Sequence, residues 1–77
     1  MANISKPVPS FLDTCDKLHI QGGKQVWASK DRRRYYTWDA RHGEIEGFDS
    51  RGRHLGAFDA VSGKQTKEAV KGRKLHV

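Results

Sequence analysis

The sequence predicts an α+β fold, in which one short N-terminal helix packs on a twisted antiparallel β-sheet of four or five strands. Two observations predict this class. From residue 24 onward, β-favouring stretches alternate with turn residues, whereas the region before it contains a single stretch with helical spacing. The connections between the β-favouring stretches are too short for crossovers, so neighbouring strands must pair antiparallel. A chain of 77 residues forms one domain with a thin core.

The N-terminal segment carries the signals of a helix start. Pro7 and Pro9 keep the first residues extended, and Ser10 with Asp13 three residues later is typical of a helix N-terminus. Apolar residues follow at helical spacing until two consecutive glycines end the pattern. We therefore predict a helix from about Phe11 to Leu18 that covers one face of the sheet and leaves the other face for a ligand.

The rest of the chain divides into β-favouring stretches separated by turns. They read QVWAS, RYYTWDA, GEIEGF, RHLGAF and GRKLHV, at residues 25–29, 34–40, 43–48, 53–58 and 72–77. Turn residues lie between most of them, at Lys30-Asp31, Asp49 to Gly52 and Ser62-Gly63. We expect residues 1–77 to form a single domain, with residues 1–23 as an N-terminal helical extension or linker.

The positive charge of the chain predicts a polyanionic partner. The formal net charge is +6, and residues 1–23 contribute nothing to it, since two lysines there balance two aspartates. Nucleic acid fits this excess best and an acidic protein comes next, because phosphate neutralisation supplies most sequence-independent affinity for nucleic acid. The residues that we expect to contact RNA phosphates are Lys30, Arg32, Arg33, Arg34, Arg53, Lys71 and Lys74. The aromatic residues after the arginine run offer base-stacking platforms, although for Trp27, Tyr36 and Trp38 a place in the core is favoured.

Other features narrow the class of protein. Cys15 is the only cysteine, so the chain has no intrachain disulfide and fits a reducing cytoplasm. The first residues lack a basic stretch followed by an apolar run, and no stretch approaches the length of a membrane span, so we expect no secretion signal and no membrane partner.

The stretch WDARHGEIEG, residues 38–47, concentrates acid–base groups in an otherwise basic protein. If it is extended after its turn, His42, Glu44 and Glu46 point the same way while Ile45 points to the core. Metal-free cleavage of RNA needs a base for the ribose 2′-hydroxyl, an acid for the leaving 5′-oxygen and a cation for the phosphorane charge. A carboxylate, a histidine and an arginine suffice, so the stretch predicts a ribonuclease site in which Asp39 holds the imidazole.

Two other interpretations of this stretch remain open. His42 can be a surface histidine in a turn, with Glu44 and Glu46 as solvated strand residues in a non-enzymatic basic RNA-binding module. The same carboxylates with His42 can form a divalent-metal site of a general nuclease. Carboxylates on an RNA-facing surface repel phosphate, however, which argues against the non-enzymatic module. His54, beside Arg53, is interpreted as structural or solvated.

With WDARHGEIEG, the later HLGAFD and Arg73 near the C-terminus, the chain resembles the cytotoxic ribonuclease domain of the ribosome-inactivating colicins and cloacin. The resemblance covers about Trp27 to Val77 in four blocks that keep their order and spacing. It implies a helix on a highly twisted antiparallel sheet, a single cut in 16S ribosomal RNA at the decoding site of the 30S subunit, and a cognate immunity protein. The +6 charge predicts that this inhibitor is acidic. The turn at Asp49 to Gly52 is one residue shorter than in the family, the C-terminal segment lacks the family's prolines, and residues 1–23 match nothing in it.

The resemblance implies that Asp39, His42, Glu46 and Arg73 are the catalytic residues, with Glu44 at a nearby acidic position as possible support. Our hypothesis makes Glu46 the base and His42 the acid, with a 2′,3′-cyclic phosphate as product. Asp39 would fix the tautomer of His42, and Arg73 would fork onto the phosphate oxygens. No metal, other cofactor or DNA substrate is expected. The resemblance implies action in the cytoplasm of a target bacterium, by a free-standing toxin or part of a larger delivered one.

Overall fold

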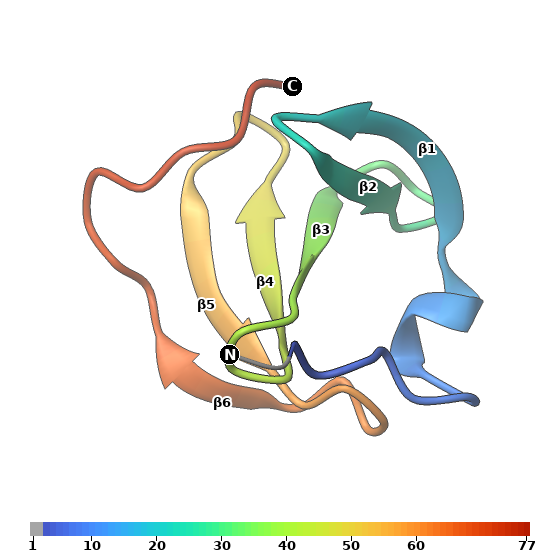
Figure 1. Cartoon of the computed structure of the whole chain (residues 1–77). Helices are drawn as coiled ribbons and strands as arrows, with labels where there is room; N and C mark the ends of the chain where they lie inside the picture. Colours follow the sequence, from blue (N-terminus) through green and yellow to red (C-terminus); the bar gives the residue numbers. More distant parts are fainter. Residues whose placement is uncertain (1–2) are drawn as a thin grey trace.

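A computed structural model describes residues 3–77 as a six-stranded antiparallel sheet whose strands follow one another in chain order. The strands are β1 (Asp16–Gln21), β2 (Lys24–Ala28), β3 (Arg34–Asp39), β4 (Glu44–Asp49), β5 (His54–Phe58) and β6 (Gln65–Glu68). Figure 1 shows that the sheet curves strongly and that the C-terminal segment passes along β5 to the tip of the β1–β2 hairpin. Among the described residues, no helix is long and apolar enough to cross a membrane.

The prediction of an α+β fold with an N-terminal helix was wrong. The described residues contain one 3₁₀ turn, η1 (Phe11–Thr14), and no α-helix. The predicted start signal exists, because the Ser10 hydroxyl accepts from the backbone N–H of Leu12 and Asp13 accepts from the N–H of Ser10. Cys15 is already extended, however, and Asp16 begins β1. An eight-residue helix is marginal by itself, whereas pairing with β2 satisfies the same backbone groups within the sheet.

The strands that the sequence analysis missed are the two at the edges of the sheet. Four expected stretches correspond to β2, β3, β4 and β5, but β1 and β6 were not expected, so the sheet has six strands rather than four or five. All four residues of β6 are exposed, and β1 has no fully buried residue. Neither edge strand therefore has a buried apolar face to reveal it in the sequence. The expected strand at 72–77 forms only an isolated bridge between Arg53 and Lys74.

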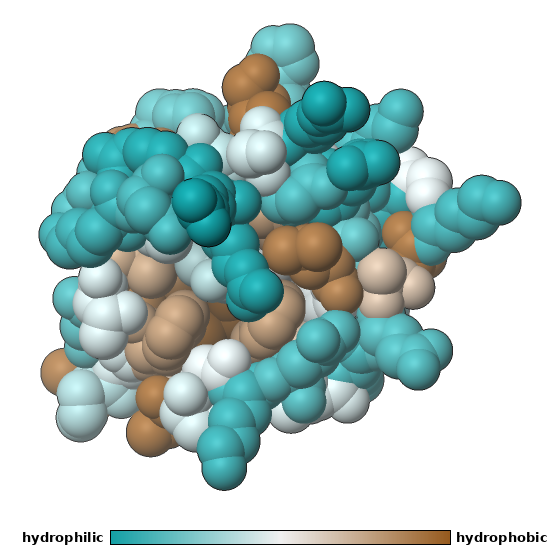
Figure 2. Space-filling view, turned by 180° about the vertical axis from the view of Figure 1, so that it is seen from behind, coloured by the Kyte–Doolittle hydropathy of each residue, from teal (hydrophilic) through white to brown (hydrophobic). Residues whose placement is uncertain are grey.

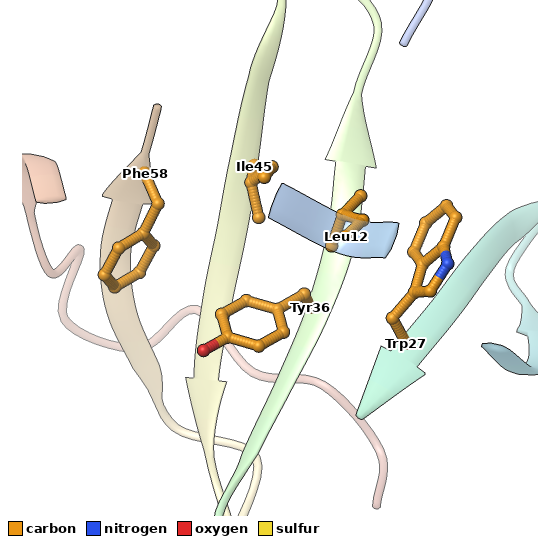
Figure 3. Packing of buried hydrophobic residues seen from close by; sticks show 5 residues of the cluster. All are labelled: Leu12, Trp27, Tyr36, Ile45 and Phe58. Atoms are coloured by element: carbon orange, nitrogen blue, oxygen red, sulfur yellow. The ribbon is translucent and has the colours of Figure 1, made fainter. Parts of the chain in front are cut away.

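The hydrophobic core lies between η1 and one face of the sheet. It consists of Leu12, Trp27, Tyr36, Ile45 and Phe58 (Figure 3). The ring of Phe58 lies over Gly47, where an added Cβ would be 2.3 Å from the ring. The preference for core positions of the aromatic residues is confirmed for Trp27 and Tyr36, while Trp38 packs partly buried against the cluster. Figure 2 shows hydrophilic side chains around a smaller apolar area on the face turned away from the viewer in Figure 1.

The other face of the sheet carries the polar residues of the WDARHGEIEG stretch. Thr37 pairs with Glu46 and Asp39 with Glu44 across β3 and β4, so these side chains alternate with the core residues Tyr36 and Ile45. The sequence prediction that Ile45 points to the core is confirmed, since Ile45 is fully buried.

The C-terminal segment, residues 69–77, is tied to this side of the sheet at three points. The Arg73 carbonyl accepts from the His54 N–H at 3.1 Å, and the Gly52 carbonyl accepts from the Leu75 N–H at 2.7 Å. Gly52 has a φ of +82°, and a Cβ there would be 1.9 Å from the Leu75 carbonyl oxygen, so only glycine allows this approach. The side-chain amide of Gln21 bonds both the N–H and the carbonyl of His76, at 2.8 and 2.6 Å. These contacts bring Arg73 to the face that carries Glu46.

Candidate active site

The turn between β3 and β4 holds His42 through Asp39. One oxygen of Asp39 accepts from the backbone N–H groups of Arg41 and His42, at 3.1 and 3.2 Å. The other oxygen lies 2.8 Å from Nδ1 of His42. Because the carboxylate accepts at Nδ1, that nitrogen carries a proton and Nε2 is directed away from Asp39. The His42 side chain is 57% exposed, so this second nitrogen is accessible to a substrate.

Asp39 is held in its ionised form. Burial would raise the pKa of Asp39, but the hydrogen bonds from the His42 side chain and from the backbone outweigh this effect, so that its pKa lies below the ordinary value. Asp39 is therefore negatively charged at neutral pH, and its carboxylate holds the His42 ring through the contact at Nδ1.

Glu46 on β4 is held from two sides. Its Oε1 accepts from Arg73 Nη1 at 2.8 Å, and its Oε2 accepts from His54 Nε2 at 2.7 Å. His54 Nδ1 accepts from the Val70 N–H at 2.8 Å, so the proton of the neutral ring lies on Nε2 and points to Glu46. The His54 side chain is only 2% exposed. A histidine that the sequence analysis interpreted as structural or solvated thus links Glu46 directly to the C-terminal segment.

Glu44 lies on the same face but is engaged by β6. Its carboxylate accepts from Lys67 Nζ at 2.8 Å and from the Thr66 hydroxyl at 3.3 Å. The hydrogen bond to Glu44 raises the pKa of Lys67 above the ordinary value. Both carboxylates are therefore paired with a cation, Glu44 with Lys67 from β6 and Glu46 with Arg73 from the C-terminal segment.

All four predicted catalytic residues line one cavity of about 460 Å³, which we call the catalytic cavity. An adjoining cavity of about 200 Å³ shares the same four residues and adds Glu44 and His54. The residues brought together are Asp39, His42, Glu46 and Arg73. Arg73 is 27 positions from Glu46 in the sequence, so the contact between them depends entirely on the path of the C-terminal segment.

Four of the predicted RNA-binding residues, Lys30 and Arg32 to Arg34, do not converge on this site. Lys30 and Arg32 bond Asp16, and Arg33 lies 3.9 Å from Asp31. These three residues belong to the β2–β3 connection, and Arg34 is the first residue of β3, at the end opposite Asp39. Five steps along the extended strand separate Arg34 from Asp39, which is roughly 17 Å.

The C-terminal lysines and Arg53 lie nearer to the catalytic residues. Lys74 lines the catalytic cavity itself, while Lys71 and Arg53 line a neighbouring hollow beside Arg73. Arg53 is paired with Asp49 at 2.9 Å. Of the predicted phosphate contacts, Lys74 is therefore the one that lines the same cavity as the four predicted catalytic residues.

Two cations that the sequence analysis did not single out also line the catalytic cavity, Lys24 and Arg41. Arg41 directly precedes His42, so its position next to the acid–base residues was a usable signal. Lys24 had no such signal, because only the path of the β1–β2 hairpin brings it to the site.

His54 was missed because a bulge in the β4–β5 pairing places it opposite Phe48, a register that the alternation of the sequence does not reveal.

One group of side chains meets the spacing for a cation. Asp39, His42 and Glu44 each offer a ligand atom, and these atoms lie within 4.8 Å of one another. Oxygen and imidazole donors of this kind are accepted by divalent metals. Each carboxylate already has a partner, since Asp39 is bonded to His42 and Glu44 to Lys67. A metal ion would have to displace both contacts.

The fold and the site together define a class of protein, a twisted antiparallel sheet that presents an acid–base set and an arginine on one face. Comparison with known proteins identifies the family within this class. The chain matches the family described as Cytotoxic over residues 5–76, and it belongs to that family. The resemblance seen in the sequence is thereby confirmed. The expectation that residues 1–23 match nothing in the family was wrong, since the family match begins at residue 5 rather than near Trp27.

Three curated relatives from Escherichia coli show the extent of the similarity. Over 48 residues, the chain is 52% identical to cloacin, 48% identical to colicin E3 and 46% identical to colicin-E6. The matched segment is 60% of this chain but 9% of each relative, so the chain spans a small part of the length of these proteins.

Proposed function

We propose that this chain is the cytotoxic ribonuclease domain of a bacteriocin-type toxin, and that it cleaves 16S ribosomal RNA in the 30S subunit at the decoding site. Membership of the Cytotoxic family and the similarity to cloacin and colicin E3 support a toxin. The observation that carries the chemistry is the contact of Arg73 with Glu46, beside the Asp39–His42 pair. These four groups supply a base, an acid, a residue that holds the acid, and a cation.

The reaction is an acid–base transesterification. A carboxylate oxygen of Glu46 takes the proton of the ribose 2′-hydroxyl, and the 2′-oxygen attacks the phosphorus. The bond to the 5′-oxygen breaks, and protonated His42 donates a proton from Nε2 to that oxygen. The products are a 2′,3′-cyclic phosphate and a 5′-hydroxyl. Each of the two proton transfers is typically worth about 10² to 10⁴ in rate.

Arg73 has to change partners for this reaction. In the structure its guanidinium bonds Oε1 of Glu46. A substrate phosphate offers two oxygens that match the guanidinium fork, so the arginine moves to the phosphate and stabilises the charge of the phosphorane. This exchange frees Oε1 to accept the 2′-hydroxyl proton, while His54 keeps its bond to Oε2.

The proposal includes neither a metal nor another cofactor, because side chains of the chain supply the acid, the base and the cation. The partners are the 30S subunit and an acidic immunity protein that covers the +6 surface, with no DNA and no membrane. Since the matched segment is only 9% of cloacin, we infer that a larger toxin delivers this chain into the cytoplasm of the target bacterium.

The test is incubation of the purified chain with intact bacterial ribosomes in excess chelator, with RNA ends mapped by primer extension. We expect one cut near the 3′ end of the small-subunit RNA. His42→Ala and Glu46→Gln should each lower the rate at least about 10²-fold, whereas His19→Ala, a change at an exposed histidine of β1, should not.

Each other outcome removes a defined part of the proposal. Near-normal cleavage by both His42→Ala and Glu46→Gln would refute the residue assignment. Activity that chelator abolishes would favour the metal site at Asp39, His42 and Glu44. Scattered cuts would reject the decoding site as target, and tight RNA binding without any cut would favour a non-enzymatic module.

A further inference from the structure

Strands β2 and β3 separate before they reach the catalytic end of the sheet. Their last paired residues are Val26 and Thr37. Beyond this point, Lys24 on β2 pairs with β1, and Asp39 on β3 pairs with β4, but the two strands do not pair with each other. Figure 1 shows the β1–β2 hairpin turning away from β3. The sheet is therefore open directly beside the turn that carries His42.

A second cavity of about 460 Å³ occupies this opening, and we call it the side groove. It shares Lys24, Asp39 and Arg41 with the catalytic cavity, so the two hollows border the same three residues. Trp27 and Trp38 contribute the large apolar part of its lining. The Trp38 indole N–H donates to the Ile4 carbonyl at 3.0 Å, which fixes the orientation of the ring.

The two cations at the border of the side groove are not engaged by carboxylates. Within residues 3–77, no salt bridge joins Lys24 or Arg41 to an acidic side chain, whereas Arg32, Arg53 and Lys67 are all paired. Asp39 is the acidic residue nearest to them in the lining, and its oxygens are taken by His42 and by backbone N–H groups. Both cations are exposed and available to a phosphate.

We propose that the side groove binds the nucleotide immediately downstream of the cleaved bond. The 3′-phosphate of this nucleotide lies between Lys24 and Arg41, and its base rests against Trp38, which is half-buried, whereas Trp27 is a buried core residue that supports the groove from below. The assignment to the downstream rather than the upstream nucleotide follows from the proposed function, on which this inference rests. His42 donates to the leaving 5′-oxygen, which belongs to the downstream nucleotide. The lining of the side groove includes Asp39, Ala40 and Arg41, the three residues that directly precede His42 in the chain, whereas no residue of β4, which carries the base Glu46, belongs to it.

The test compares two double variants with the same change of charge. Lys24→Gln/Arg41→Gln removes the two cations of the groove, and Lys17→Gln/Lys64→Gln removes two exposed lysines that line none of the described cavities. Both are made in a His42→Ala background, so that the RNA stays intact. Affinity for an RNA oligonucleotide that spans the cleavage site is measured as a function of salt concentration.

We expect the groove variant to reduce the magnitude of the slope of log affinity against log salt by about 0.7, the value for one neutralised phosphate of single-stranded RNA, since Lys24 and Arg41 share the same phosphate. The lysine control should keep the parental slope. The difference should vanish on an oligonucleotide that ends at the downstream nucleotide without a 3′-phosphate. Equal slopes for the two variants, or an equal loss on both oligonucleotides, would overturn the proposal.

The failure of this inference is distinguishable from that of the proposed function. The chain with His42 intact is tested for cleavage of the same spanning oligonucleotide and of ribosomes. If it cuts neither, the proposed function fails, whatever the slopes. If it cuts and the groove variant behaves like the lysine control, the side groove is not the downstream subsite.

Discussion

His54 offers the sharpest test of how the site is held together. Replacement by phenylalanine keeps an aromatic ring of similar size in a buried position but removes both hydrogen bonds of the imidazole. The bond to the charged Glu46 at 2.7 Å is worth about 1.5 to 3 kcal/mol. The Val70 N–H loses its partner at 2.8 Å, but Val70 is exposed and water can replace it, so this loss is about 1 kcal/mol.

We therefore expect His54→Phe to lower the free energy of unfolding by about 3 kcal/mol, which for a domain of this size corresponds to a fall in Tm of about 12 to 24 °C. Urea unfolding at neutral pH, followed by tryptophan fluorescence, measures the change. A loss below about 1 kcal/mol would refute the assignment of both hydrogen bonds to this side chain.

Two further variants separate the bonds of His54. Asparagine places an acceptor near the position of Nδ1 and keeps the bond to Val70, whereas glutamine places a donor near Nε2 and keeps the bond to Glu46. Each should retain part of the stability. In single-turnover cleavage under conditions where both are folded, His54→Gln should retain more of the rate than His54→Asn. Equal rates would show that the bond to Glu46 does not matter for the chemistry.

Three other predictions concern the core, the pH dependence and the N-terminal segment. Gly47→Ala should cost about 1 to 3 kcal/mol in denaturant unfolding, because its Cβ would lie 2.3 Å from the Phe58 ring; an unchanged midpoint would mean that the ring moves aside freely. The pKa of Asp39 is below its ordinary value, so its contribution to stability is complete above about pH 4 and is lost as the pH falls through the lower folded value. Stability measured below about pH 4 should accordingly decline less steeply in Asp39→Asn than in the parent chain, and parallel curves would contradict this. Removal of residues 1–4 deletes the bond from the Ile4 N–H to the Ala40 carbonyl, at 2.7 Å, and the bond from the Trp38 indole to the Ile4 carbonyl, at 3.0 Å, and should lower both kcat and RNA affinity; an unchanged kcat would show that the bond to Ala40 does not steady the turn.

Much of the central sheet could be predicted from the sequence, and its edges could not. β2 to β5 contain the buried alternating residues that reveal a strand, and their short connections require antiparallel neighbours. β6 is fully exposed and β1 nearly so, and both form because a neighbouring strand offers unpaired backbone groups. The Ser10 cap signal was real but started a 3₁₀ turn, because local capping does not determine how far a helix continues.

The candidate site also contains residues that could be predicted from the sequence and residues that could not. Asp39, His42, Glu44 and Glu46 lie within eight consecutive residues, so strand alternation and a short turn are enough to place them on one face. The sequence therefore contained the family, the acid–base set and the excess of positive charge. Arg73, His54 and Lys24 reach the site only through the path of the C-terminal segment, a β-bulge and the separation of β2 from β3. These are contacts between distant segments, and their geometry depends on packing and backbone pairing that no local pattern of residues encodes.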